Sequence, residues 1–301
     1  MAKLSDKELM KLTGADERLL KLFKQRQKEA LHEAGHIKDH FFSKKIRVLG
    51  VSGSRRIVHD CPAEDSTSEW LLDKCLDEAK KAGAEIFKLR LMDYSIEPCK
   101  GCYSTTNTQC HYKCTCYPEG EYGDDMTNKL YDAVMWADII VWATPVHNFK
   151  VSSYMSLFLD RLISMDGSIS PADPQAVKDK ATNVKHTKFI ELTGGKEFGS
   201  GYLRRFTGKV AGVIVSGHEV GASMTISSLF MTLNQFGMMF PPFSSMYAIN
   251  TICDPLYADK TKLRSKCYED EARMLARNLI TAAKISKRKN DYWWEYESKS
   301  N

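Results

Sequence analysis

The sequence has no long apolar run and no leader-like beginning. No stretch approaches the ~20 apolar residues that a membrane-spanning helix needs. The first twenty residues, MAKLSDKELMKLTGADERLL, are charged throughout and lack the apolar centre of a signal peptide. We therefore expect a cytoplasmic protein that makes no contact with a membrane.

The sequence also has little excess charge of either sign. The 43 basic residues outnumber the 38 acidic ones by only five, whereas a nucleic-acid-binding protein usually carries a clustered basic face. We expect no nucleic-acid partner. With 43% hydrophobic and 27% charged residues, the composition is that of a globular protein, long enough for one large or two small domains.

Two common nucleotide-binding motifs are missing. The chain has no G-x-G-x-x-G turn after a strand, which argues against a dinucleotide-binding Rossmann domain, and no GxxxxGK[ST], which argues against a P-loop. A site for a mononucleotide or another small anion stays open.

Alternating strands and helices begin at Ile46. Short apolar runs predict five strands, at 46–54, 84–91, 138–146, 209–217 and 243–250. Amphipathic helices are expected between and after them, at 68–83, 124–137, 152–163, 223–236 and 269–286. Near-continuous apolar strands separated by helices indicate a five-stranded, doubly wound parallel sheet. Such folds bind ligands beyond the carboxyl ends of their strands.

The remaining segments suggest a domain organisation around this sheet. Residues 1–43 read as a polar helical arm that packs on the main domain or on a neighbouring subunit. The main domain, 44–255, contains a cysteine-rich loop at 97–126 and an insert at 166–207, whose glycines would let it move as a lid. Residues 256–301 form a last helix and a tail. Trp293 and Trp294 in this charged tail indicate docking onto another surface.

Small and hydroxylated residues follow the first strand. Ser52 and Ser54 leave the strand, and the run Ser66, Thr67 and Ser68 opens the next helix. Hydroxyls and free backbone N–H groups at a helix N-terminus favour the binding of an anion, and the ligand that we expect there is the phosphate of a mononucleotide. A simple helix cap, for which serine and threonine are preferred anyway, is the equal alternative.

The third and fourth predicted strands end in similar residues. The loop 146–149 can lay backbone amides and an aromatic side chain against a flat ring. After the fourth strand, Ser216, Gly217 and Gly221 allow close backbone approach. Because three strand ends share this character, we interpret them as one site.

Five of the nine cysteines lie between residues 97 and 126: Cys99, Cys102, Cys110, Cys114 and Cys116. In a reducing compartment, clustered cysteines are more often metal ligands or redox groups than structural disulfides. Four thiolates could hold an iron–sulfur cluster or a structural zinc, although two clean CxxC pairs are missing for zinc. Free or disulfide-forming cysteines are the third alternative.

Separated motifs in the right order resemble the NADPH-dependent FMN reductase family. They are VLGVSGSRR, DSTSEWLL, PCKGC, ADIIVWATPVHNFKVSSYMSLFLDRL and KVAGVIVSGHEVGASMTISSL, spread over about 46–252. More narrowly, the chain resembles the iron–sulfur flavoproteins. The resemblance implies a flavodoxin-like fold, bound FMN and a homodimer or homotetramer.

The resemblance also implies roles for the strand-end residues. The phosphate of FMN would be held by Ser52, Ser54, Arg55, Ser66, Thr67 and Ser68. The isoalloxazine would be flanked by Pro145, Val146, His147, Asn148 and Phe149 on one side and by Ser216, Gly217 and Gly221 on the other. His147 departs from the family, which more often has tyrosine there, so Phe149 becomes the candidate stacking partner.

In iron–sulfur flavoproteins, a cysteine run after the second strand holds a [4Fe–4S] cluster near a flavin, usually as CxxCxxC with a fourth cysteine. This chain keeps Cys99 and Cys102 at that spacing, whereas the later cysteines depart from it. We expect Cys99, Cys102, Cys110 and Cys116 to bind the cluster, with Cys114 as the spare or the substitute.

Together these features predict an FMN-dependent oxidoreductase that relays electrons between a reduced donor, ferredoxin or NAD(P)H, and an acceptor. One alternative is an NAD(P)H-dependent flavin, quinone or nitro-compound reductase with zinc or free cysteines. The other is a non-enzymatic flavodoxin-like carrier or redox sensor. No side chain is assigned a proton-transfer role. Asp124 and Asp125 are interpreted as a helix start, and Asp160 and Arg161 as a pair that holds the fold.

Overall fold

The computed structural model describes seven stretches of the chain, which form two compact units interleaved along the sequence. The described residues are 4–41, 45–61, 63–102, 110–120, 123–194, 203–251 and 259–288. The unit that we call the sheet unit comprises 41–96, 132–159 and 206–301. The other, the helical unit, comprises 1–40, 97–131 and 160–205.

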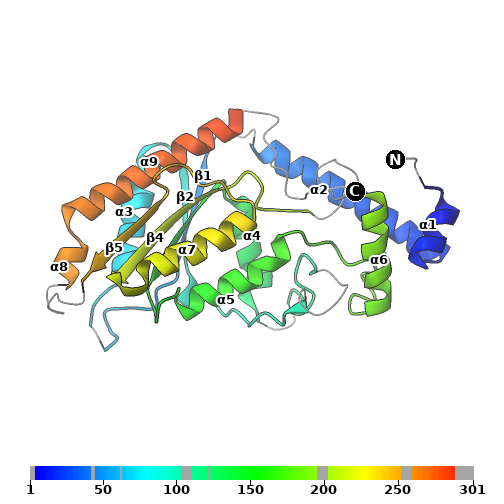
Figure 1. Ribbon diagram of the computed structural model, residues 1–301, viewed down its shortest axis with the longest axis horizontal. Helices are drawn as coiled ribbons and strands as arrows, with labels where there is room; N and C mark the ends of the chain where they lie inside the picture. Colours follow the sequence, from blue (N-terminus) through cyan, green and yellow to red (C-terminus); the bar gives the residue numbers. More distant parts are fainter. Residues whose placement is uncertain are drawn as a thin grey trace. The chain divides into compact units, whose positions relative to one another are not determined.

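The sheet unit is built on five parallel strands (Figure 1). They are β1 (Arg47–Ser52), β2 (Glu85–Arg90), β3 (Ile139–Pro145), β4 (Val210–His218) and β5 (Ser245–Asn250). Their order is β2-β1-β3-β4-β5, which is the order of flavodoxin-like folds, with a switch point between β1 and β3. The predicted fold class is confirmed.

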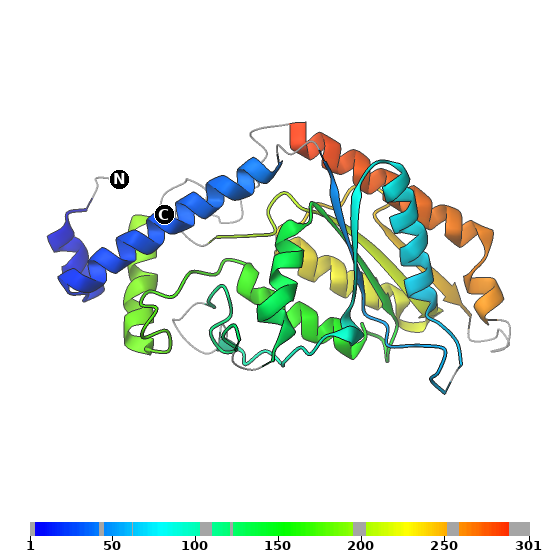
Figure 2. The same cartoon turned by 180° about the vertical axis from the view of Figure 1, so that it is seen from behind.

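Helices cover both faces of this sheet. One face carries α3 (Thr67–Lys81) and α9 (Lys266–Arg288), which lie side by side (Figure 2). The short η1 (Leu91–Asp93) follows β2, and α8 (Asp259–Leu263) precedes α9. Ile214 of β4 belongs to the core beneath α9. Its neighbour Val213 points the other way and lines a groove beside α7 (Glu219–Gln235).

Two further helices, α4 (Tyr131–Trp136) and α5 (Ser153–Leu162), begin in one unit and end in the other. Within the sheet unit, Phe158 of α5 packs against Trp142 of β3, with ring centroids 5.9 Å apart. Both side chains are fully buried, so this contact fixes the start of α5 directly after the carboxyl end of β3.

The helical unit packs the N-terminal arm against the insert. It contains α1 (Asp6–Thr13), α2 (Glu17–Phe41), the π-helical turn η3 (Met126–Leu130), η4 (Ile163–Met165) and α6 (Lys180–Thr193). Leu19, Leu20 and Phe23 of α2 form one core with Phe189 and Ile190 of α6. The predicted domain limits and the lid role remain predictions, and the glycine-rich part of the insert lies outside the described residues. Among those described, no helix is long and apolar enough to cross a membrane.

Candidate flavin site and cysteine cluster

The carboxyl ends of β1, β3 and β4 lie next to one another in the sheet. Ser52 is in register with Ala143, and Pro145 is in register with Ser216. The sheet therefore brings the three polar strand ends that the sequence singles out to one edge of the sheet unit. Whether they bind a flavin is a proposal taken up below.

Hydroxyl groups gather where β1 leads into α3. Ser52, Ser54, Ser66 and Ser68 are all buried. Ser66 begins the helix: its Oγ accepts a hydrogen bond from the Glu69 N–H at 3.2 Å and lies 3.0 Å from Ser68 Oγ. Thr67 is half-buried and Arg55 is exposed. The helix cap and the anion site, which the sequence offered as alternatives, thus share the same side chains.

Glu69 is a residue that the sequence reasoning missed. Its carboxylate accepts a hydrogen bond from Ser52 Oγ at 3.1 Å, and it pairs with Lys88 Nζ at 2.8 Å and Arg90 Nε at 2.9 Å. Lys88 Nζ also pairs with Asp73 at 2.7 Å, so the two cations of β2 are shared between carboxylates beside the helix N-terminus. The sequence could have indicated Glu69, because serine three residues before glutamate at a helix start is typical of a capping box.

The loop after β3 is held in an uncommon backbone conformation. His147 and Lys150 exchange backbone hydrogen bonds at 2.8 and 3.2 Å. Between them, Asn148 and Phe149 have φ values of 49° and 66°, a region that phenylalanine rarely occupies. Strained residues of this kind cluster at ligand-binding loops. The turn leaves Phe149 49% exposed at the edge of the site.

Glycines keep the three loops close together. A Cβ atom at Gly53 would lie 2.9 Å from Ser152 Oγ, and one at Gly221 would lie 2.8 Å from the Cα of Phe149. Gly221 also has a φ of 91°, which side chains disfavour. At Gly217, a Cβ would come within 3.1 Å of the Val146 side chain. The cradle is therefore shaped by positions that only glycine fits.

Hydrogen bonds connect the same loops. Ser152 Oγ donates to the Gly53 carbonyl at 2.5 Å, which ties the loop after β1 to the start of α5. The Val146 N–H donates to the Ser216 carbonyl at 2.9 Å, which ties the loop after β3 to that after β4. His218 stands at the start of α7 without a side-chain capping bond. The residues present fit a planar ligand that carries a phosphate.

The five clustered cysteines belong to the helical unit. Cys102 and Cys116 approach to 2.9 Å between their Sγ atoms, which is longer than the disulfide bond of about 2.05 Å. None of the described cysteines forms a disulfide. Burial raises the pKa of Cys110 to about 12, and the charges of Cys114, Cys102 and Cys99 act in the same direction.

Cys114 is the thiol best stabilised as a thiolate. A hydrogen bond with Cys116 lowers the pKa of Cys114 to about 6, and Arg161 and the backbone N–H groups of Cys116 and Tyr117 act in the same direction. The same hydrogen bond, together with burial, raises the pKa of Cys116. Soft thiolates of this kind suit iron–sulfur clusters and zinc.

A buried ion pair closes the cysteine-rich loop. Arg161 and Asp124 are each 1% exposed, and the guanidinium binds both carboxylate oxygens, at 2.9 and 2.8 Å. Arg161 also donates to the Glu97 carbonyl at 2.8 Å, while Asp124 accepts from the Glu97 N–H at 3.0 Å. The pair therefore joins the two ends of the segment 97–126.

This pair refines two interpretations of the sequence. Asp124 does cap the helical turn that follows, since its carboxylate accepts from the Thr127 N–H at 3.1 Å. Arg161 holds the fold through Asp124, whereas the sequence suggested its neighbour Asp160. The distance of 37 residues between the partners hid the pair from sequence reasoning.

Within the described residues, no three histidine, cysteine, aspartate or glutamate side chains are placed to hold a single metal ion. The described thiols nevertheless share one loop, in which Cys102 and Cys116 are in contact.

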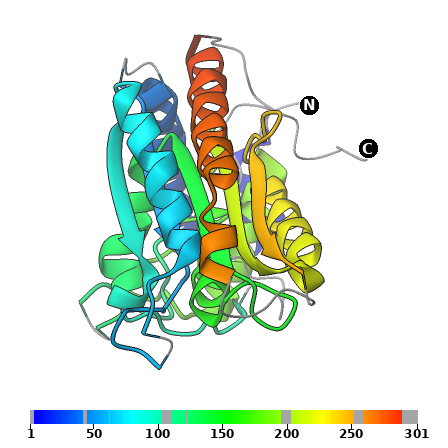
Figure 3. The same ribbon diagram turned by 90° about the vertical axis from the view of Figure 1, so that its left-hand side faces the viewer.

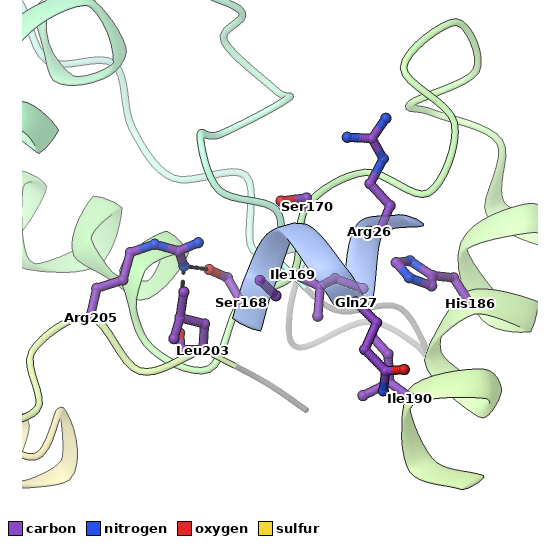
Figure 4. Close-up of a pocket in the computed structure, with 10 residues that line it drawn as sticks. Arg26, Gln27, Ser168, Ile169, Ser170, His186, Ile190, Leu203 and Arg205 are labelled. Carbon is purple, nitrogen blue, oxygen red and sulfur yellow. Dashed lines mark hydrogen bonds between the residues drawn. The ribbon is translucent and has the colours of Figure 1, made fainter. Parts of the chain in front are cut away.

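A separate small cavity lies in the helical unit between α2 and α6 (Figure 4). Its volume of about 20 Å³ holds one or two water molecules and excludes a flavin. His186 lines it, is 1% exposed, and has no hydrogen-bond partner at either ring nitrogen among the described residues. Burial, with help from His111 and Arg26, lowers the pKa of His186 to about 4, so its imidazole is neutral.

The fold is that of a flavodoxin-like α/β protein, and its three polar strand ends meet at one edge of the sheet. The family model of the NADPH-dependent FMN reductases matches residues 46–251, which is more than half of the chain. The chain belongs to the NADPH-dependent FMN reductase family. FMN is the flavin that this family's name gives.

Individual relatives agree with this assignment. An iron–sulfur flavoprotein of Archaeoglobus fulgidus is 30% identical over 116 residues, 38% of this chain and 48% of the relative; the match thus spans about half of that relative's length. Among solved structures, RosB with a bound 8-demethyl-8-formylriboflavin-5′-phosphate has a TM-score of 0.57 and 20% identity, with 81% of each chain covered. This last likeness concerns the fold alone.

Proposed function

We propose that the chain binds FMN at the edge formed by the ends of β1, β3 and β4. The buried serines at the start of α3 hold the phosphate, and the loops 145–149 and 216–221 flank the isoalloxazine. The observation that carries this proposal is the set of three loops whose close approach depends on Gly53, Gly217 and Gly221. Flavin supplies the redox chemistry when it is bound, and the chain positions it.

The cysteine-rich loop is proposed to hold a [4Fe–4S] cluster. Support comes from the gathered thiols, from the thiolate-stabilising groups around Cys114 and from the similarity to the iron–sulfur flavoprotein of Archaeoglobus fulgidus. A cluster exchanges one electron at a time, so a chain with both centres would pass electrons from ferredoxin or NAD(P)H to an acceptor.

The proposed ligands are Cys99, Cys102, Cys110 and Cys116, with Cys114 as the spare or the substitute. The approach of Cys116 Sγ to 2.9 Å from Cys102 Sγ supports the inclusion of Cys116, because a cluster needs thiols that converge.

A second candidate is an NAD(P)H-dependent reductase of flavins, quinones or nitro compounds whose cysteines bind no cluster. The observation that favours it is the spacing of the cysteines after Cys102, which departs from that of the iron–sulfur flavoproteins. Such a protein would oxidise NAD(P)H rapidly and give no low-temperature paramagnetic signal after reduction.

Purification without oxygen, with flavin, iron, sulfide and zinc measured together, separates the candidates. The first predicts bound FMN with about four iron and about four sulfide per chain. Bound FMN with zinc and no sulfide, or with no metal, would favour the second. Single Cys→Ser variants then identify the ligands: Cys116→Ser should abolish iron retention, whereas Cys114→Ser should leave most of it.

A further inference from the structure

The turn between α8 and α9 reaches back to the candidate phosphate site. The family match ends at residue 251, so α8, α9 and the turn between them lie beyond it. Figure 3 shows α8 and the start of α9, in orange, beside the blue loop that leads from β1 into α3. A segment outside the matched residues therefore contacts the place where we propose that the phosphate of FMN binds.

Arg264, in this turn, binds the residue that precedes the helix cap Ser66. Its Nη1 donates to Asp65 Oδ2 at 3.1 Å, and its Nη2 lies 3.0 Å from Asp65 Oδ1. Nη2 also donates to the Asp65 carbonyl at 3.3 Å. The Arg264 side chain is only 16% exposed, whereas that of Asp65 is 52% exposed. A guanidinium that binds both carboxylate oxygens fixes the orientation of its partner as well as balancing its charge.

The same guanidinium also lies over the ring of Trp70, near the start of α3. Arg264 Cζ is 5.5 Å from the centroid of this ring, and Lys74 Nζ is 5.1 Å from it. An indole ring attracts cations at such distances. The backbone N–H of Trp70 donates to the Ser66 carbonyl at 3.0 Å, which is the first hydrogen bond of the helix. Arg264 thus holds the chain on both sides of Ser66 and Ser68.

The turn that carries Arg264 is itself fixed to the sheet unit. Leu263 is 8% exposed and belongs to the core beneath α9. In the first turn of α9, Tyr268 Oη accepts a hydrogen bond from the Ile249 N–H at 3.3 Å and lies 3.4 Å from the Ile249 carbonyl oxygen. Because the chain is anchored before and after Arg264, the guanidinium is held firmly against Asp65.

We propose that Arg264 is a positioning residue for the phosphate of FMN. It holds Asp65 and Trp70, and through them it orients the hydroxyl and N–H groups at the start of α3. It also balances the charge of Asp65, which would otherwise place an uncompensated carboxylate beside the phosphate-binding serines and repel the phosphate. The inference rests on the proposed function, since the phosphate is expected at Ser66 and Ser68.

A purely structural role, in which Arg264 only joins α9 to α3, predicts a different result. Arg277 of α9 makes a comparable link at the other end of α3, where its Nη1 donates to Glu78 Oε1 at 2.8 Å. That link lies about three helical turns from Ser66. If joining the two helices were the whole role of Arg264, its loss would affect FMN and riboflavin equally, because the two flavins differ only in the phosphate.

Titration of the flavin-free, full-length chain with FMN and with riboflavin, followed by flavin fluorescence, tests the inference. Arg264→Met should weaken FMN binding about fivefold or more and change riboflavin binding less than about twofold. Arg264→Lys keeps the charge beside Asp65 but loses the paired hydrogen bonds, so it should regain part of the affinity for FMN. Arg277→Met is the matched control and should leave both affinities unchanged.

The outcomes separate this inference from the proposed function. An unchanged affinity of Arg264→Met for FMN, or an equal loss for FMN and riboflavin, would overturn the inference and leave the proposed function standing. An unaltered chain that does not prefer FMN to riboflavin would overturn the proposed function and this inference with it. Riboflavin binding by Arg264→Met shows in the same experiment that the variant is folded.

Discussion

Replacing Arg161 with methionine should destabilise the helical unit strongly, because it leaves the Asp124 carboxylate buried without its cation. Both side chains are 1% exposed. The substitution removes two charge-assisted hydrogen bonds to Asp124 together with the bond to the Glu97 carbonyl. Methionine has a similar reach, so the loss concerns charge and hydrogen bonding more than volume.

The size of the effect follows from the burial. Breaking a buried ion pair by removing one partner costs about 3–5 kcal/mol, since an uncompensated charge stays in the interior. Arg161→Met combined with Asp124→Asn should regain at least about 1 kcal/mol, because the amide carries no charge and its one oxygen still accepts from the backbone N–H of either Glu97 or Thr127. The two effects are therefore coupled rather than additive.

Hydrogen exchange followed by mass spectrometry is the appropriate assay, since it reports local opening of peptides from 110–131 and 160–194. The control is Lys266→Met, which removes an ion pair to Asp270 whose side chains are 72% and 58% exposed and should change stability little, because solvent screens exposed ion pairs. If Arg161→Met costs no more than this control, the pair does not hold the cysteine-rich loop, and the reasoning is refuted.

Two further predictions concern the flavin cradle and the small cavity. Gly221→Ala should push the Phe149 loop aside and weaken FMN binding about tenfold or more, as measured by fluorescence titration. The control is Gly83→Ala, which should leave the affinity for FMN unchanged, because Gly83 has a similar φ of 88° but no neighbouring atom within 4 Å among the described residues. Equal affinities of both variants for FMN would contradict the geometry. Burial lowers the pKa of His186 to about 4 in the folded chain, whereas the pKa of a histidine in an unfolded chain is about 6.5. As the pH falls below about 6.5, only the unfolded chain therefore gains a proton at this residue. Stability should therefore drop by about 2 kcal/mol between pH 7 and pH 5, and urea titrations of His186→Phe should lack that part of the drop; an identical pH profile in both proteins would refute it.

The fold could be read from local patterns, because buried parallel strands leave continuous apolar runs such as IIVWA in β3. The strand-end loops were likewise visible as small and hydroxylated residues. Sequence reasoning also placed the helix after β4 at 223–236, and Val220 and Gly221 before that range do have non-helical backbone angles.

What the sequence could not reveal depends on contacts between distant residues. Nothing local indicates that Arg161 pairs with Asp124, or that the arm and the insert share the core around Phe23 and Phe189. The left-handed backbone at Phe149 is equally hidden, since phenylalanine has no preference for it. Such features are fixed by packing, which overrides local propensity.

The central claim is that the residues at the carboxyl edge of the sheet bind FMN through its phosphate. Comparing the affinities of the flavin-free chain for FMN and for riboflavin tests it most directly, because the two ligands differ only in that phosphate. FMN should bind at least about tenfold more tightly than riboflavin, and Ser66→Ala with Ser68→Ala should narrow the difference. Equal binding of both flavins, or a difference that the serine variants leave intact, would contradict the account.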